Sequence, residues 1–312
     1  MTVTATPRRG NSSHVVSSQV RAASRKQKKP RRERKSVILT IALWACAGYF
    51  LLPFLWLVLA STKSDTDLFT SFGLAFGKAF SLFSNIGTVF SYENGSFGLW
   101  LANSAFYSLS SALGAVILST LAGYAFAKYR FSGGRAIFSA LLGSIMIPSA
   151  ALALPTYLLF ANLNLTNTAW AIILPSIVNP FGLYLLRIYA ADAVDDSLLE
   201  AARLDGASEF RIFWQVSVRL LGPAIVTVFL LALVGTWNNY FLPLIMLNQS
   251  SLYPITVGLA QWAASSNAGG GARVLFSTVI TGSFISVIPL VAAFLYLQRF
   301  WQSGLSSGSV KG

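Results

Sequence analysis

The sequence predicts an all-α integral membrane protein with six transmembrane helices, and two observations lead to this fold class. Only 11% of the 312 residues are charged, and the mean hydropathy is +0.62, whereas a soluble domain usually has about 25% charged residues. Six apolar stretches are also long enough to cross a hydrocarbon core, which takes roughly 20 helical residues. The bilayer is therefore the expected solvent for most of the chain.

The six predicted spans contain a single charged side chain, Arg187, near the end of the fourth span. The first span is longer than the apolar region of a cleaved signal peptide, which has about 7–15 residues, so we expect this span to be retained. The predicted spans are Val37–Ala60, Leu101–Ala127, Ala136–Phe160, Ala169–Tyr189, Leu220–Leu247 and Leu275–Leu297.

Basic residues in the connections predict the orientation, because segments that face the cytoplasm hold an excess of Lys and Arg. With the N-terminus in the cytoplasm, the inner segments contain twenty Lys and Arg and the outer segments contain three. Both termini are then cytoplasmic, in the cell membrane. The predicted parts are a basic disordered tail (1–36), the first span with its external loop (37–100), a five-helix core (101–297) and a C-terminal tail (298–312).

Proline predicts that several spans are broken, because eight of the eleven prolines lie in or at the ends of spans. Pro243 clashes with the carbonyl of Asn239, which then needs another partner inside the membrane. The preceding residues Trp237, Asn238, Asn239 and Tyr240 could stack on a sugar ring and bond its hydroxyls. A helix-packing role explains the same residues. These five residues are therefore only candidates for a translocation path.

The connection between the fourth and fifth spans, about residues 191–219, predicts two short amphipathic helices on the cytoplasmic side. We expect the first helix to start near Asp192, with Val194, Leu198 and Ala202 along its apolar face. Gly206 then ends this helix. The opening turn holds three acids, which the helix dipole favours, namely Asp192, Asp195 and Asp196.

The second short helix is expected to present an apolar ridge of Phe210, Phe213 and Trp214. Anchors at this spacing fit a groove in a partner protein. The alternative is an interfacial helix that lies on the membrane surface.

This connection resembles the EAA loop of permease subunits of ABC importers. The matching residues are Glu200, Ala201 and Ala202, followed after three residues by Gly206 within Leu204-Asp205-Gly206-Ala207. The family pattern then continues as Ile-x-Leu-Pro, whereas this chain has Val216-Ser217-Val218-Arg219. Pro223 is the residue expected to take over the break at the entry to the fifth span.

Further motifs resemble the sugar-importer branch of that family over residues 60–312. They include Asn167–Trp170 and Trp237–Leu244 in the fourth and fifth spans. The C-terminal sequence is similar to that of the maltose-type second permease subunit. In that subfamily the C-terminal tail reaches the ATPase, which implies the same contact here for Gly308, Val310 and Lys311.

The resemblance implies the type I ABC-importer permease fold and the import of a sugar of the di- or oligosaccharide class. It implies four kinds of partner: a second homologous permease subunit, a dimer of ATP-binding subunits, an extracytoplasmic solute-binding protein and membrane lipid. It also implies that the ATPase is coupled through Glu200, Ala201, Ala202, Asp205, Gly206, Phe210, Phe213 and Trp214. A secondary transporter, a channel subunit and an ABC importer of a non-sugar solute are the alternatives.

The sequence offers no candidate for catalysis, a metal site or ATP binding by this chain. Gly73–Ala79 is one residue too short for a phosphate-binding loop and lacks its hydroxyl residue. His14 is the single histidine and Cys46 the single cysteine, so neither a metal cluster nor an intrachain disulfide is expected. We therefore predict no enzyme activity, no bound cofactor, ATP use by a partner subunit, and no nucleic-acid binding by the basic tail.

Overall fold

The computed structural model describes residues 2, 36–267 and 275–308, with the side chains of the last range described up to Phe300. It divides the chain into two units, 1–52 and 53–312. The predicted tail 1–36 lies almost wholly outside the described residues, as do Val310 and Lys311. All regular secondary structure in the described ranges is helical.

The first unit contains the beginning of α2 (Val37–Ser61), and the second unit starts at Pro53, inside this helix. The bounds of α2 agree with the first predicted span. Cys46 is exposed on the part of α2 that belongs to the first unit.

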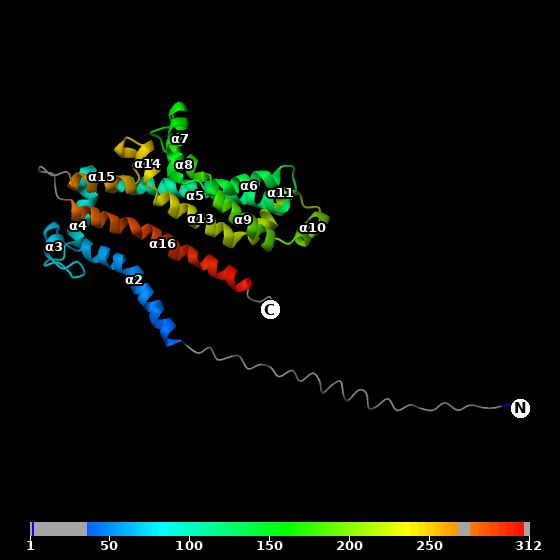
Figure 1. The fold of residues 1–312 in the computed structure, drawn as a ribbon, viewed down its shortest axis with the longest axis horizontal. Coiled ribbons are helices and arrows are strands. Elements are labelled where there is room, and N and C mark those ends of the chain that lie inside the picture. Colours follow the sequence, from blue (N-terminus) through cyan, green and yellow to red (C-terminus); the bar gives the residue numbers. More distant parts are fainter. Residues whose placement is uncertain (1, 3–35, 268–274, 309–312) are drawn as a thin grey trace. The chain divides into compact units, whose positions relative to one another are not determined.

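The second unit contains the remaining helices, in the order shown in Figure 1. They are α3 (Asp65–Thr70), α4 (Leu82–Ser91), η2 (Tyr92–Gly95), α5 (Ser96–Lys128), α6 (Gly134–Ile145), α7 (Ser149–Asn162), α8 (Trp170–Ile177), α9 (Pro180–Ala193), α10 (Asp196–Leu204), α11 (Glu209–Ile212), η3 (Phe213–Ser217), α12 (Val218–Leu220), α13 (Gly222–Trp237), α14 (Phe241–Met246), η4 (Ser250–Leu252), α15 (Ile255–Asn267) and α16 (Phe276–Gly308).

Helix α5 is the centre of this unit, because α9 and α13 pack along it and α16 packs on α13 (Figure 1). Glycine residues of α5 permit the close approach of α9 and α8 to this helix. A Cβ on Gly123 would lie 2.9 Å from the backbone nitrogen of Arg187 on α9, and one on Gly114 would lie 2.7 Å from Ile177 on α8. Small residues at helix contacts let backbones come together where lipid supplies no hydrophobic drive.

In the part of the chain that the structure describes, four helical stretches are long and apolar enough to cross a membrane, and up to six are if each of two bent pairs is one span. The predicted third span is one of these pairs: α6 and α7 meet at an angle of 106°. The expectation of one continuous helix there is wrong, because Pro148 holds an extended backbone between α6 and α7 and disfavours a helical conformation at the residue before it.

The predicted fifth span is interrupted at both ends. The helices of residues 209–220 meet α13 at 76°, with Pro223 in the first turn of α13 as expected. Helix α13 then ends at Trp237, and α14 starts at Phe241.

The predicted sixth span starts as expected at Phe276 but continues past Leu297 to Gly308. Residues 298–308 are thus helical. No proline or glycine occurs between Gln298 and Ser303, so nothing in this stretch ends the helix at the predicted boundary.

Candidate functional site

The segment of residues 191–219, here called the connecting segment, lies at the end of α5 that contains Lys128. Helix α9 continues through Asp192 to Ala193, and α10 starts only at Asp196. The predicted start near Asp192 is therefore wrong. The reason is that Val194 leaves the helical conformation and is fully buried, while Asp195 caps α10 by accepting a hydrogen bond from the backbone N–H of Ser197 at 3.1 Å.

The apolar face of α10 is also one residue out of the predicted register. Leu199 is buried and Leu198 is exposed, whereas Ala202 is partly buried as expected. The prediction is wrong because it counts the helical spacing from Val194, which lies before the start of α10. The buried cluster beneath α10 includes Leu199, Ile212 and Tyr124 of α5, so α10 is fixed to the end of the bundle.

Gly206 ends α10 as predicted. Its φ is +79°, a conformation that glycine adopts without steric cost. The N–H of Gly206 donates to the carbonyl of Arg203 and the N–H of Ala207 donates to that of Ala202, both at 3.0 Å. This pair of bonds is a Schellman motif. A Cβ on Gly206 would meet nothing within 4 Å, so the requirement is conformational.

The predicted aromatic ridge is divided between two surfaces. Phe213 is 8% exposed and packs on the ring of Tyr124 at 5.0 Å between centroids, so its place on the ridge is wrong. Phe210 and Trp214 are 75% and 51% exposed. The cause is the buried cluster of Tyr124, Leu199 and Ile212, which Phe213 completes. A π-helical turn, η3, also starts at Phe213. A π turn of this kind often occurs at functional sites.

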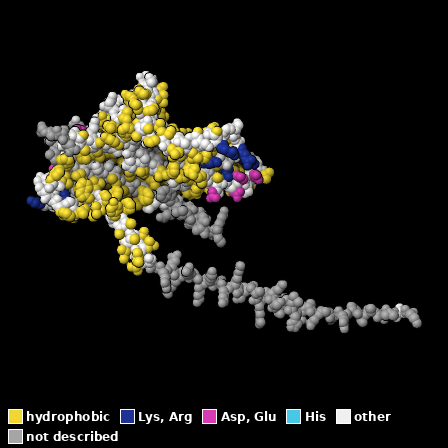
Figure 2. All heavy atoms as spheres, viewed as in Figure 1, with side chains coloured by type: hydrophobic (Ala, Val, Ile, Leu, Met, Phe, Trp, Pro, Cys, Tyr) yellow, Lys and Arg dark blue, Asp and Glu magenta, His cyan; other side chains and the backbone are white. Residues whose placement is uncertain are grey.

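The exposed residues of the connecting segment combine apolar and charged groups. Leu204 is 89% exposed, close in sequence to exposed Asp205 and Gly206. Glu200 and Ala201 are exposed on α10, and among the described residues no hydrogen bond or ion pair involves the Glu200 carboxylate. In Figure 2 this end shows a concentration of acidic and basic side chains, whereas apolar side chains cover much of the adjoining helices.

Two polar contacts join the connecting segment to α5. The Lys128 ammonium lies 2.8 Å from Asp196 Oδ1, and the Lys128 side chain is only 7% exposed. The Tyr129 hydroxyl donates to Glu209 Oε2 at 2.8 Å. Arg203 Nε donates to Glu209 Oε1 at 2.6 Å, so one carboxylate joins α10, α11 and the end of α5.

These contacts shift the pKa of Glu209 and that of Tyr129. The hydrogen bond from Arg203, followed by that from Tyr129, lowers the pKa of Glu209. Burial, followed by the hydrogen bond to Glu209, raises the pKa of Tyr129 to about 12. The sequence reasoning did not single out Lys128, Tyr129 or Glu209. The available signal was a Lys-Tyr pair directly after a span and a Ser-Glu pair at a helix start.

The break between α13 and α14 satisfies its freed backbone groups within the protein. The carbonyl of Asn239, which Pro243 frees, accepts a hydrogen bond from Thr256 Oγ1 at 2.8 Å. The side chain of Asn239 accepts from the N–H of Leu242 at 3.4 Å, and that of Asn238 donates to the Val234 carbonyl at 3.0 Å. The polar groups at the break are therefore paired within the protein.

The five candidate path residues do not share one surface. Trp237 and Pro243 are buried, Asn238 and Tyr240 are exposed, and Asn239 lies between these classes. Trp237 lines a cavity of about 350 Å³ whose other lining residues are Ala105, Ser108, Leu109, Phe229, Leu233, Pro289, Leu290, Ala293, Tyr296 and Leu297. A cavity with so few polar groups does not suit a sugar, because a ligand-binding site needs polar groups at defined positions to orient its ligand.

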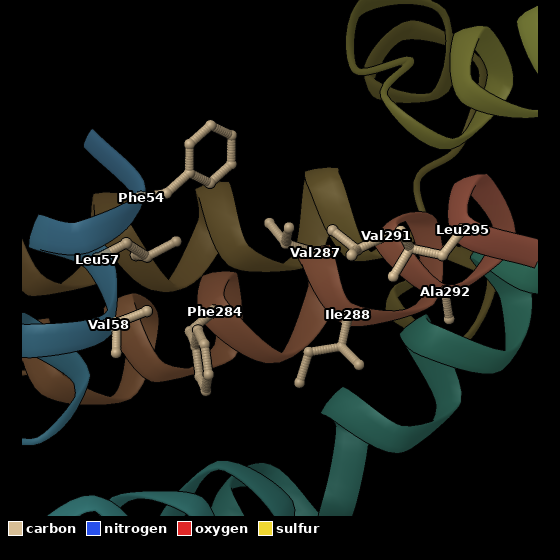
Figure 3. Close-up of a pocket in the computed structure, with 9 residues that line it drawn as sticks. All are labelled: Phe54, Leu57, Val58, Phe284, Val287, Ile288, Val291, Ala292 and Leu295. Atoms are coloured by element: carbon tan, nitrogen blue, oxygen red, sulfur yellow. The ribbon is translucent and has the colours of Figure 1, made fainter. Parts of the chain in front are cut away.

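A second hollow, of about 440 Å³, lies between α2 and α16 (Figure 3). All of its lining residues are apolar: Phe54, Leu57, Val58, Phe284, Val287, Ile288, Val291, Ala292 and Leu295. This groove suits hydrocarbon and not a polar solute. Within the described residues, no group of three or more His, Cys, Asp or Glu side chains could hold a metal ion.

Comparison with known proteins shows what the chain is similar to. Residues 115–302 match the family described as binding-protein-dependent transport system inner membrane component. An arabinooligosaccharides transport system permease protein of Halalkalibacterium halodurans is 32% identical over 278 residues, which cover 89% of this chain and 97% of that protein. A lactose transport system permease protein of Rhizobium radiobacter is 29% identical over 281 residues, which cover 90% of this chain and 98% of that protein.

Two further similarities concern the fold and the range of solutes. An sn-glycerol-3-phosphate transport system permease protein of Yersinia enterocolitica is 29% identical over 209 residues, 67% of this chain and 73% of its own. The crystal structure of a bacterial ABC transporter involved in the import of the acidic polysaccharide alginate has a chain with a TM-score of 0.74 and 23% identity, covering 88% of this chain and all of that one. The predicted fold class is confirmed.

Proposed function

Because the chain belongs to the family of binding-protein-dependent transport system inner membrane components, we propose that it is the permease subunit of an ATP-driven sugar importer. The observation that carries this proposal is the family match over residues 115–302, which includes the whole connecting segment, together with sugar-transport relatives of nearly the same length. The secondary transporter and channel alternatives have no support in these similarities.

The solute we propose is a di- or oligosaccharide. The arabinooligosaccharide and lactose permeases support this class. The glycerol-phosphate permease, similar over 67% of this chain, favours a second candidate, an importer of a smaller polyol phosphate.

The proposed assembly contains a second homologous permease, a dimer of ATP-binding subunits and an extracytoplasmic solute-binding protein, all within or against membrane lipid. The chain itself would bind no cofactor and catalyse no reaction, and a partner subunit would use the ATP. The family supports this division, since its members are membrane components of transport systems.

We further propose that the connecting segment is the surface that receives the ATP-binding subunits, on the cytoplasmic side. Leu204, Phe210 and Trp214 are exposed apolar residues, which fit a partner's groove, and Glu200 has a carboxylate free for a basic partner group. Ala202, Gly206 and Phe213 would act from beneath this surface by holding its two short helices in place. Ala201 and Asp205 would lie at its edge.

The remaining site assignments are also proposals. Asn238, Asn239 and Tyr240 would face the translocation path, while Trp237 and Pro243 would shape the helix break from the buried side. At the C-terminus, α16 continues to Gly308, the last described residue, and this helix would lead Val310 and Lys311 toward the ATP-binding subunits.

The test is to purify the assembled complex and to measure ATP hydrolysis with its solute-binding protein and a panel of arabinooligosaccharides, lactose and glycerol 3-phosphate. We expect stimulation by one sugar class, and none from the isolated chain. Stimulation by glycerol 3-phosphate alone would support the second candidate. Uptake that continues without ATP and stops when the proton gradient is removed would contradict the proposal.

A further inference from the structure

We propose that α5 is a rigid link that passes movement of the connecting segment to the loop of residues 247–254 at the opposite end of the bundle. Lys128 and Tyr129 are then positioning residues at one end of this link, and the first turns of α5 form the other end. This inference rests on the proposed function of the connecting segment.

At the connecting segment, the last residue of α5 and the residue after it each bind a different short helix. Lys128 pairs with Asp196, the first residue of α10, and Tyr129 bonds Glu209, the first residue of α11. Because Arg203 also binds Glu209, α10 and α11 are joined to each other and move as one body with the end of α5. The Lys128 side chain is 7% exposed and that of Asp196 is 77% exposed, so the contact anchors an exposed residue of α10 to the end of the bundle.

At the opposite end, α5 donates hydrogen bonds to successive carbonyls of one loop. Trp100 Nε1 bonds the Ser250 carbonyl at 2.8 Å, and the Tyr107 hydroxyl bonds that of Leu252 at 2.9 Å. The Asn103 amide bonds the carbonyls of Ser251 and Tyr253 at 2.9 and 3.1 Å. Ser104 Oγ accepts from the N–H of Ile255 at 2.7 Å. Three side chains of α5 therefore bond this loop, and a fourth bonds the first residue of α15, directly after it.

The same loop continues to the break between α13 and α14. Thr256, directly after Ile255, supplies the hydrogen bond to the freed carbonyl of Asn239. The loop is also held from the other side by Asn167, whose side chain accepts from the N–H groups of Asn248 and Gln249. A continuous series of contacts thus leads from the connecting segment, along α5, to the helix break.

The backbone of α5 is suited to this role. It has 33 residues without an internal proline, a length of about 50 Å at 1.5 Å per residue. The other membrane-length stretches in the described part of the chain each contain proline: Pro53 in α2, Pro175 in α8 and Pro289 in α16. Sharp kinks occur at such residues, so α5 transmits a displacement with less bending.

The test uses the assembled complex in nanodiscs, with Cys46→Ser and one environment-sensitive dye on a cysteine at position 197, an exposed position of α10 outside the apolar docking residues, or at position 249. ATP with vanadate is the probe, and both dyes should respond in the parent. With Lys128→Met and Tyr129→Phe combined, the response at 197 should remain. The response at 249 should fall at least about fivefold, the factor that corresponds to about 1 kcal/mol for one of the two contacts removed.

Matched variants separate the link from a loss of folding. Arg130→Met removes the neighbouring exposed charge and Lys128→Arg keeps the ion pair, and both should leave the response at 249 unchanged. Asn103→Ala combined with Tyr107→Phe acts at the far end and should reduce the same response. If the double variant at 128 and 129 does not assemble, the response at 249 is measured in Tyr129→Phe alone and in the Asn103→Ala, Tyr107→Phe variant. A reduced response in these variants supports the link, and an unchanged response in both overturns it.

The outcomes distinguish this inference from the proposed function. A parent in which neither dye responds to ATP and vanadate overturns the coupling role of the connecting segment. A parent in which both dyes respond, with unchanged responses in the near-end and far-end variants, overturns the link through α5 alone.

Discussion

Gly206 shows how much one residue contributes to the connecting segment. Its left-handed conformation turns the chain from α10 into α11, and the two hydrogen bonds of the turn end at Arg203 and Ala202. Arg203 also binds Glu209 on α11, so the turn and the ion pair together set the angle between the two short helices. A change at either residue should therefore act on the surface presented to the partner.

We predict that Gly206→Val abolishes uptake and releases the ATP-binding subunits while the chain stays inserted in the membrane. A β-branched residue at φ +79° is strained by about 1–3 kcal/mol, which the short helices can relieve only by changing their angle. Chain abundance, co-purification and uptake measure this outcome. Gly222→Val, at a glycine with no Cβ neighbour within 4 Å and no positive φ, is the control. Normal co-purification with normal uptake would refute the docking role.

The Glu209 carboxylate predicts a pH dependence of this same segment. Its pKa is lowered by the hydrogen bonds from Arg203 and Tyr129, so the ionised form stabilises the folded segment. This contribution is complete above the ordinary carboxyl pKa and is lost as the pH falls through the lowered folded-state pKa. Hydrogen exchange of the 204–212 amides, corrected for intrinsic rates, should show it. Glu209→Gln should be less protected throughout, and equal protection with unchanged pH dependence would contradict the assignment.

At the scale of elements, the broken helix between α13 and α14 is held by a contact from α15. Pro243 removes one backbone bond, and Thr256 replaces it from 17 residues further along the chain. The asparagine side chains at the break, Asn238 and Asn239, cap the two helix ends.

We expect Thr256→Val to destabilise the protein by about 1 kcal/mol, the typical net contribution of one hydrogen bond, because this bond is only partly buried. Thermal unfolding in detergent measures the change. Thr156→Val on α7 is the matched control, because the Thr156 hydroxyl makes an exposed hydrogen bond to a carbonyl within its own helix. An effect of equal size in both variants would show that the Asn239 carbonyl gains nothing from Thr256.

The exposed position of Asn238 gives a second prediction for this element. A cysteine at position 238 should react with a water-soluble thiol reagent applied from outside during turnover, if this residue faces the path. Ala232→Cys, on a buried position of α13, should stay protected, and both variants carry Cys46→Ser. Protection of position 238 in every state would mean that Asn238 only packs between helices.

At the scale of the whole molecule, the orientation in the membrane is a matter of charge distribution. The excess of Lys and Arg on one set of connections predicts that the connecting segment and both termini are cytoplasmic. The proposed ATP-binding partners would lie on that side, so the orientation and the proposed docking surface depend on each other.

Reporter fusions at Asn267 and Lys311 test this orientation. We predict that a periplasm-type reporter is active at Asn267 and that a cytoplasm-type reporter is active at Lys311. A fusion at Asp205 should match Lys311 and serves as an internal control. The reverse pattern would exclude the proposed orientation together with the docking of ATP-binding subunits at the connecting segment.

The sequence by itself determined the features that depend on local chemistry. Apolar length predicted the spans, and the bounds of the first one agree closely with α2, because burial in lipid is decided residue by residue. The need for a left-handed residue identified Gly206, and Pro243 identified the helix break. These signals depend on the backbone preferences of single residues, which act in any surroundings.

Only the tertiary structure decided where side chains point and which distant residues meet. The buried ring of Phe213 and the shifted register of α10 follow from the cluster around Tyr124, to which residues from α5 and the connecting segment contribute. The bonds of Glu209 to Tyr129, of Lys128 to Asp196 and of Thr256 to Asn239 join residues from separate helices. No spacing rule places such partners, because their distance is set by the packing of whole helices.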